Sequence, residues 1–437
     1  PMAAISAKAL LAVTFALYSL PGRAADVRHE AVSDPITEPP AFPATVPEGV
    51  PSLQMSLDFA SPALAIGVYR PVAEVPSRGV RIAPFTFRAW MLAGIGYDDN
   101  VRLSTTNKRS SMIFTLNPSF SAGLEGPLHR YFAVYRGSYA RYASESLSNY
   151  ENHNLTLQAR DEWSTRLRTA LQYDYLRGHD PTGSTGSAAT AADHWSVHTA
   201  RGTVAYGAEG APAGISATLG YKSRRYLDRE RDSRDYELVD VGGSFSYRLT
   251  GQMNAIAVAR HADITHEHAP NLDSTETHYA VGVRWEATGK TSGTVRLGYM
   301  TKDFVSPALG STSMPTYEVS VTWSPLIYSV FELGARKAFV EAVELGSSTV
   351  VDNYGALSWN HVWSERIRST LVAGYGRQSH EGLARLDNYY NFSARGSFRL
   401  QRRLYLGAEY RRDVRASNAT AFDYTRNVLL FTIESAI

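Results

Sequence analysis

The sequence contains no cysteine and no long apolar run. The absence of Cys among the 437 residues excludes a disulfide scaffold, a thiolate metal site and a cysteine nucleophile. No stretch of about 18 consecutive apolar residues occurs, which excludes a helical membrane protein. Charge of either sign is scarce and nearly balanced, with 44 Lys+Arg against 42 Asp+Glu. This balance argues against a dedicated nucleic-acid binder.

Aromatic residues are abundant where charge is scarce. They make up 11% of the chain and include 26 Tyr, while charged residues make up only 20%. Low charge, many tyrosines and no spanning helix together fit a membrane protein that crosses lipid with strands. We therefore predict an all-β fold, namely a transmembrane antiparallel up-and-down β-barrel. A soluble propeller or sandwich is the rival, and it predicts more uniform connections and an uncharged interior.

The first 25 residues have the pattern of a signal peptide. Lys8 precedes an apolar run from Ala9 to Leu20, and Pro21 to Ala25 supply a small-residue cleavage site. We expect cleavage after Ala24 or Ala25. Residues 1–25 thus predict export, and the barrel predicts a destination in the bacterial outer membrane.

A proline-rich segment follows the predicted signal peptide. Ten of the 20 prolines lie between Pro35 and Pro84. Such a stretch does not form a helix or a central strand, so residues 26–84 are predicted to be an extended periplasmic linker. A passive tether is the simpler interpretation, and docking of a periplasmic partner is the alternative.

From residue 85 to residue 437 the chain repeats one pattern. In Tyr317–Trp323, apolar Tyr, Val and Trp alternate with Glu, Ser and Thr, and Tyr390–Arg399 alternates in the same way. A period of two indicates strands, and an apolar face opposite a charged face is typical of a strand between lipid and water. Counting such segments predicts about 18 strands, and an even number returns both barrel ends to the periplasm.

The predicted connections alternate in length. Short ones fall at sites such as Gly126-Pro127, Thr250-Gly251 and Gln401-Arg402, as expected of periplasmic turns. Longer polar ones are predicted to be extracellular loops. They are 99–110, 178–193, 227–233, 266–274, 303–313, 338–348, 378–386 and 416–421.

The alternation also predicts which side chains face the lumen. Fifteen basic and six acidic positions share the inner face. A barrel of this size encloses a water-filled channel, and rings of Arg favour anions. Ion pairs that merely hold the wall together are the alternative for any single Arg. The predicted pore-lining residues are Arg88, Arg160, Arg168, Arg201, Lys222, Arg248, Arg284, Arg296, Lys302, Arg336, Arg368, Arg395, Arg399, Arg411, Arg426, Asp174, Asp240, Glu318, Glu332, Glu409 and Glu434.

Two hairpins carry a family resemblance. Gly94–Val101 with Asn117–Phe120 resembles the opening hairpin of the putative β-barrel porin 2 family. Tyr410–Ser417 with Asp423–Asn427 is similar to its closing hairpin. The resemblance covers residues 82 to the end. It implies an outer-membrane barrel without assigned chemistry, whose relatives often accompany exopolysaccharide synthesis and export.

Catalytic and metal sites are not predicted. His261, His266 and His268 lie at a strand–loop junction without the rigid geometry of a metal site. No Gly-x-Ser-x-Gly motif or phosphate-binding loop occurs in a suitable context. We predict no enzyme activity and no cofactor.

The sequence therefore predicts a passive porin that exports an exopolysaccharide through a basic lumen, with an acidic polymer as one option. Uptake of small anionic solutes and a non-conducting structural or adhesive surface barrel remain alternatives. The expected partners are outer-membrane lipid, the barrel-insertion machinery, a periplasmic polysaccharide-export partner and the polysaccharide itself. The last strand ends in Ile437 rather than the usual Phe, an aliphatic end that we expect the insertion machinery to accept.

Overall fold

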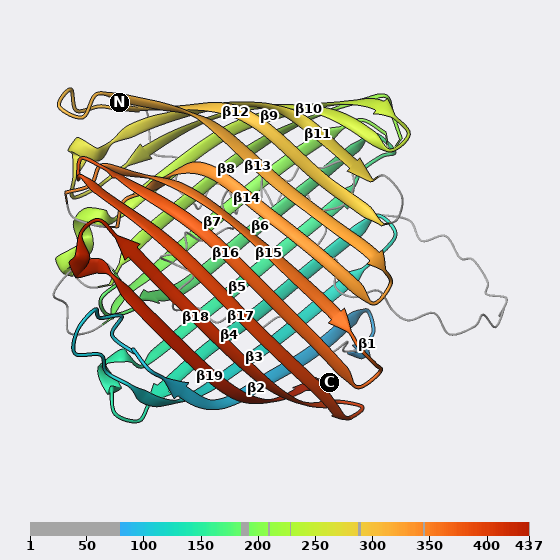
Figure 1. The fold of residues 1–437 in the computed structure, drawn as a ribbon. Coiled ribbons are helices and arrows are strands. Elements are labelled where there is room, and N and C mark those ends of the chain that lie inside the picture. The colour runs from blue at the N-terminus through green and yellow to red at the C-terminus, as the bar shows by residue number, and fades with distance from the viewer. Residues whose placement is uncertain are drawn as a thin grey trace. The chain divides into compact units, whose positions relative to one another are not determined.

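The barrel is a single antiparallel sheet that closes on itself. The computed structural model describes residues 79–184, 192–208, 210–227, 229–286, 290–343 and 346–436. Strands β2 to β19 follow each other in chain order around the barrel, and β19 pairs with β2 to close it (Figure 1). The predicted antiparallel barrel of about 18 strands is confirmed. The predicted signal peptide and most of the predicted linker lie outside the described residues.

Nineteen strands and four short 3-10 helices make up the regular structure of the described residues. The short β1 pairs with the start of β2, just before the barrel begins. The strands are β1 (Val80–Ile82), β2 (Phe85–Asp98), β3 (Ser111–Glu125), β4 (His129–Tyr142), β5 (Tyr150–Glu162), β6 (Leu167–Asp180), β7 (Asp193–Tyr206), β8 (Ala213–Tyr226), β9 (Tyr236–Thr250), β10 (Met253–Thr265), β11 (Ser274–Glu286), β12 (Thr291–Phe304), β13 (Ser311–Leu326), β14 (Ser329–Glu341), β15 (Thr349–Val362), β16 (Ile367–Glu381), β17 (Arg385–Gln401), β18 (Leu404–Ser417) and β19 (Tyr424–Ala436). The 3-10 helices are η1 (Ser146–Ser148), η2 (Arg229–Arg234), η3 (Pro270–Leu272) and η4 (Thr420–Phe422).

The two faces of the sheet differ as the alternation predicts. In β2, Phe87, Met91 and Ile95 are 41–49% exposed, whereas the intervening Trp90 and Leu92 are buried. The same contrast recurs around the barrel, for example at Val281 in β11, which is 65% exposed. Exposed apolar side chains on the outer face suit contact with hydrocarbon. Within the described residues, none of the helices has the length and apolar character that crossing a membrane requires.

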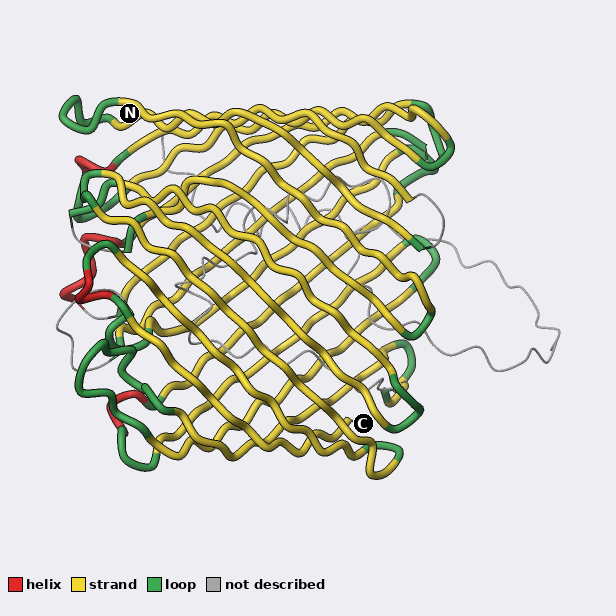
Figure 2. Tube along the Cα trace, in the orientation of Figure 1, coloured by secondary structure: helices red, strands yellow, loops and turns green. Residues whose placement is uncertain are grey.

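The connections differ at the two ends of the barrel. Two-residue turns join β9 to β10, β13 to β14 and β17 to β18 at the end where β19 finishes, which we call the short-turn end. The opposite, long-loop end carries all four 3-10 helices, which Figure 2 shows gathered on the left. This asymmetry is the one that the sequence predicts for periplasmic turns and extracellular loops.

One predicted loop is wrong, and the others are mostly shorter than predicted. The segment 378–386 is not a long loop, because β16 and β17 continue through it to a three-residue turn, Gly382–Ala384. Gly382 has φ +88°, which permits the tight turn. The barrel strands β2 to β19 are 13 to 17 residues long, more than the ~9–11 residues that cross a bilayer. Beyond the lipid both faces meet water, so the alternation that marks a strand in the sequence disappears.

Candidate functional site: the inner wall and its two mouths

The register places all 21 sequence-predicted lumen residues on one face of the sheet. Direct cross-strand pairs such as Arg296 with Glu318 and Arg395 with Glu409 show the shared face. It is the face opposite the exposed apolar side chains. That these residues line a conducting pore stays a prediction, but their surroundings divide them into two groups.

Residues of the first group are paired with carboxylates in the wall. Arg395 lies between Glu409 and Glu434, at 3.4 and 3.1 Å, and Arg411 reaches Glu409 from the other side at 3.4 Å. The indole Nε1 of Trp90 donates a hydrogen bond to Glu434 at 2.5 Å. Buried carboxylates need such partners, so these arginines neutralise charge in the wall.

Further pairs of the same kind surround the barrel. They are Arg201 and Arg260 with Asp240, at 3.7 and 3.3 Å; Arg296 with Glu318; Arg336 with Asp352, at 3.2 Å; and Lys302 with Glu276, at 3.1 Å, and with Glu341. Elsewhere on this face, Asp174 accepts hydrogen bonds from Thr156 and Gln172, Glu332 accepts one from Ser358, and Lys222 lies over the ring of Tyr236.

The closing seam of the barrel carries another buried pair. Arg426 of β19 donates from Nη2 and Nε to Asp98 of β2, at 2.5 and 2.9 Å. Its Nη2 also donates to the hydroxyl of Tyr142 on β4, at 3.2 Å. Asp98 is fully buried. These side-chain contacts join β2 and β19, the first and last strands of the barrel, in addition to their backbone hydrogen bonds.

His266 lies at the long-loop end, close enough to Lys302 for the lysine charge to act on it. It follows the last residue of β10 and is 4% exposed. Its Nε2 is 3.6 Å from Glu341 and its Nδ1 is 3.9 Å from Asp273. Burial, and then the charge of Lys302, lower the pKa of His266 from 6.5 to about 4. Hence His266 is neutral at pH 7. His261 lies apart from it, with Nδ1 3.0 Å from Thr277 Oγ1.

Sequence reasoning missed several charged residues of the inner face. Asp98 has the same parity as the predicted Arg88 and was detectable by extending the count to the end of the strand. Arg385 and Asp387 fell at the edge of the wrongly predicted loop, and they pair at 2.5 Å. The other missed residues are Glu125, Arg130, Arg136, Glu162, Asp180, Asp193, Arg224, Arg260, Glu276, Glu286, Asp352, Asp413 and Arg415.

The second group of predicted residues gathers at the short-turn end. Each member lies within four residues of the strand end nearest the short turns, on strands β2, β5, β6, β9, β11, β16 and β17. Arg130 of β4, which the sequence analysis missed, joins them. We call this group the arginine rim. Its members are Arg88, Arg130, Arg160, Arg168, Arg248, Arg284, Arg368 and Arg399.

The long-loop mouth is narrowed by loops that fold inward. Leu103 of loop 99–110 is buried against Tyr389 and Tyr424. Arg415 donates to the carbonyl oxygens of Gly183 and Ser184, at 3.1 and 2.8 Å, although these residues belong to the loop after β6. These contacts bring segments from distant strands together inside the mouth.

A second set of contacts crosses the mouth elsewhere. Arg231 and Arg234 of η2 donate to the carbonyl oxygens of Val343 and Ser347, at 3.4 and 3.0 Å. Those acceptors lie between β14 and β15, whereas η2 lies between β8 and β9.

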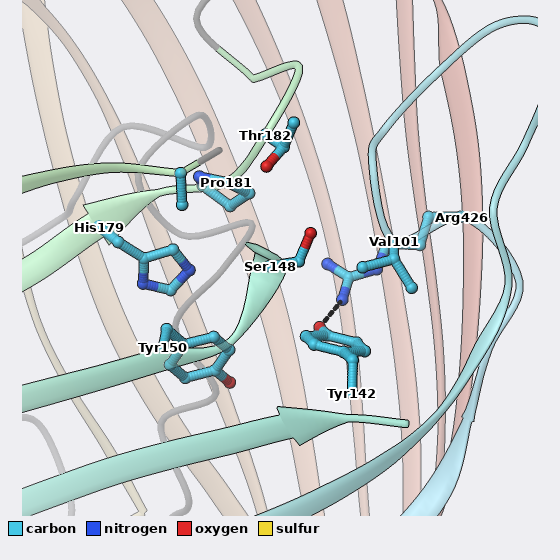
Figure 3. A pocket seen from close by; sticks show the side chains of 9 residues that line it. Val101, Tyr142, Ser148, Tyr150, His179, Pro181, Thr182 and Arg426 are labelled. Carbon is cyan, nitrogen blue, oxygen red and sulfur yellow. Dashed lines mark hydrogen bonds between the residues drawn. The ribbon is translucent and has the colours of Figure 1, made fainter. Parts of the chain in front are cut away.

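A small cavity remains beneath the first set. Figure 3 shows His179 and Tyr150 facing Arg426, which is hydrogen-bonded to Tyr142. Pro181 and Thr182 cover it from the loop side (Figure 3). The remaining lining residues are Val101, Ser148 and Ala192.

An 18-strand antiparallel barrel with an apolar outer face and a charged inner face is the architecture of an outer-membrane porin-like transporter. The chain belongs to the putative beta-barrel porin 2 family, whose sequence profile matches residues 75–436. The resemblance inferred from the two hairpins is thereby confirmed. Comparison with curated proteins finds no match.

Solved outer-membrane barrels resemble the structure at low sequence identity. The FrpB iron transporter from Neisseria meningitidis is 10% identical, with a TM-score of 0.39 over 82% of this chain and 64% of that chain. OccK2 of Pseudomonas aeruginosa is 10% identical, with a TM-score of 0.45 over 80% of this chain and 98% of that chain. A bacterial polysaccharide outer membrane secretin is 9% identical, with a TM-score of 0.34 over 80% of this chain and 98% of that chain. These likenesses concern the fold and carry no argument about cargo.

Proposed function

We propose that the protein is a passive outer-membrane conduit through which an exopolysaccharide leaves the cell. The observation that carries the proposal is the charged inner face, which continues around all 18 strands of a barrel whose outer face is apolar. Barrels of 16 to 18 strands enclose an aqueous channel, and a wall of hydrogen-bonding side chains suits a hydrated polymer.

Export of a polymer, rather than uptake of a small solute, rests on the family resemblance. Relatives often accompany exopolysaccharide synthesis and export. The arginine rim favours an acidic polymer among the possible cargoes, because guanidinium groups attract carboxylates and phosphates. In this proposal the segment 26–84 reaches a periplasmic export partner, the outer face contacts lipid, and the conduit performs no enzymatic step.

Deletion of the gene tests the proposal. We expect the deletion strain to lose surface polysaccharide and a plasmid copy of the full chain to restore it. The purified protein should also conduct ions in a planar bilayer. Normal surface polysaccharide together with an anion-conducting barrel would favour uptake of small anions. A barrel that never conducts would favour a structural or adhesive role.

A further inference from the structure

We propose that the arginine rim is a capture site for a polyanion, which engages the protein at its short-turn mouth before passing into the lumen. This deepens the proposed function, because it assigns the cargo to the class of carboxylate- or phosphate-bearing polymers and locates their first contact. The inference rests on where the arginines lie and on how they differ from those deeper in the wall.

The rim gathers like charges in a way that folding alone does not favour. Arg130 and Arg160 are direct cross-strand neighbours on β4 and β5. Arg248 and Arg284 both lie beside Asn254, one on each flanking strand. Like charges directly opposite each other destabilise a sheet. Glu125 on β3 lies directly opposite Arg130, and Glu162 lies directly opposite Arg168, so carboxylates offset part of this repulsion. An anion bound at the mouth would offset the rest.

Exposure distinguishes the rim from the most enclosed of the deeper arginines. Arg130 is exposed and the other seven rim arginines are half-buried, so an anion in the mouth reaches them. By contrast, the side chains of Arg296, Arg336 and Arg426 are 6–8% exposed and lie against carboxylates. A polymer entering from the short-turn side therefore meets more accessible guanidinium groups at the mouth than it meets further inside.

Carboxylates at the same end do not balance the rim. Those on its face are Glu125, Glu162, Glu286, Glu332 and Glu434, and Glu365 lies in a neighbouring turn, 3.4 Å from Arg399. Glu434 is already paired with the deeper Arg395, at 3.1 Å. Further cations, Arg166, Lys290, Arg366, Arg402 and Arg403, occupy the short turns themselves. The short-turn end as a whole is thus strongly basic.

Two turns, 200 residues apart, position rim arginines with the same geometry. The indole Nε1 of Trp163 donates to Thr169 Oγ1 and that of Trp363 donates to Ser369 Oγ, both at 2.9 Å. In the first turn, Ser164 Oγ accepts from the backbone N–H groups of residues 166 and 167, and Ser364 does the same for residues 366 and 367.

Each of these turns is followed by a rim arginine, Arg168 on β6 and Arg368 on β16. Arg168 also donates from Nη2 to the carbonyl oxygen of Gly207, at 3.0 Å. The paired turns have the same local geometry, so Arg168 and Arg368 occupy equivalent positions, one residue after the start of β6 and of β16.

Binding of labelled polygalacturonate to the full chain in detergent micelles tests the site without requiring conductance. The test variant carries Arg130→Gln, Arg160→Gln, Arg248→Gln and Arg284→Gln. The matched control removes four charges from the same end but from the turns, by Arg166→Gln, Arg366→Gln, Arg402→Gln and Arg403→Gln. Neutral dextran is the second probe, and heat-modifiable migration on a gel verifies that each barrel is folded.

We expect wild type to bind polygalacturonate in a salt-dependent manner and to ignore dextran. The rim variant should bind at least about tenfold more weakly, because each lost guanidinium removes a screened attraction, and the turn control should change by less than about threefold. In planar bilayers, polygalacturonate should block current from the short-turn side at lower concentration than from the long-loop side.

The inference is overturned if the rim variant binds polygalacturonate as tightly as wild type does, or if wild type binds dextran as tightly as polygalacturonate.

The capture site and the export function can be refuted separately. If deletion abolishes surface polysaccharide but the rim variant binds polygalacturonate normally, the capture site is refuted and the export function stands. If surface polysaccharide survives deletion while the rim variant loses binding, the rim is an anion site and polymer export is refuted. If the quadruple variant does not fold, the double variant Arg130→Gln with Arg160→Gln replaces it. This double variant should also bind polygalacturonate more weakly than wild type.

Discussion

The ion pair at the closing seam is the strongest stability prediction. Asp98→Asn removes the carboxylate that contacts the buried guanidinium of Arg426 at 2.5 Å and leaves Asp413, its neighbour on β18, as the nearby acidic group. Removing one partner of a buried pair destabilises by roughly 3–5 kcal/mol. We therefore expect Asp98→Asn to lower the free energy of unfolding by about that amount.

The assay is urea unfolding of the full chain in lipid vesicles, followed by tryptophan fluorescence. Glu365→Gln is the control, because Glu365 pairs with Arg399 while 91% of its side chain is exposed. Such a pair contributes about 0–1 kcal/mol. Adding Arg426→Gln to Asp98→Asn should recover part of the loss, since the stranded charge disappears. A loss below about 1 kcal/mol for Asp98→Asn would refute the reasoning that this pair stabilises the seam.

Three further predictions concern the lipid face, the long-loop mouth and pH. Val281→Arg on the outer face should reduce the free energy of unfolding in vesicles by about 2–4 kcal/mol, whereas Thr275→Arg, on the same face near the loop end, should reduce it by about 0–1 kcal/mol. Equal effects of the two substitutions would contradict the assignment of the outer face. Arg415→Gln removes the donors to the loop after β6 and should raise the mean current in planar bilayers, while Arg412→Gln, exposed on the opposite face of the same strand, should not. The pKa of His266 is lowered to about 4 in the folded protein, so between pH 6.5 and 4 the unfolded chain binds a proton that the folded chain does not. The free energy of unfolding should therefore decrease as the pH falls through that window. In the His266→Asn variant this part of the pH dependence should be absent.

Much of the fold was predictable because it depends on a local pattern. A strand between hydrocarbon and water must alternate, so segments such as Tyr317–Trp323 reveal both the strand and its inner face. The two segments whose alternation was cited, Tyr317–Trp323 and Tyr390–Arg399, lie within β13 and β17. Prediction failed at 378–386, where the strands leave the membrane and the alternation ends.

The candidate site was predictable as a face but not as a set of contacts. Parity alone assigned Arg395 and Glu409 to the same face, but it did not reveal that Glu434 of β19 reaches Arg395 across β18. Parity also made no distinction between Arg426, enclosed in the seam, and Arg248 at the open rim. That distinction depends on height along the barrel axis and on carboxylates from neighbouring strands.

The sequence by itself determined the strands, their number and which side chains turn away from lipid, because each of these follows from a period of two and from turn residues close by in the chain. Only the tertiary structure decided the rest. The register between strands determines that Arg426 meets Asp98, although 328 positions separate them in sequence. Closure of the sheet likewise brings the loop after β6 to Arg415, and it gathers eight arginines from eight strands at one mouth. Such contacts join residues far apart in the chain, so no local pattern records them.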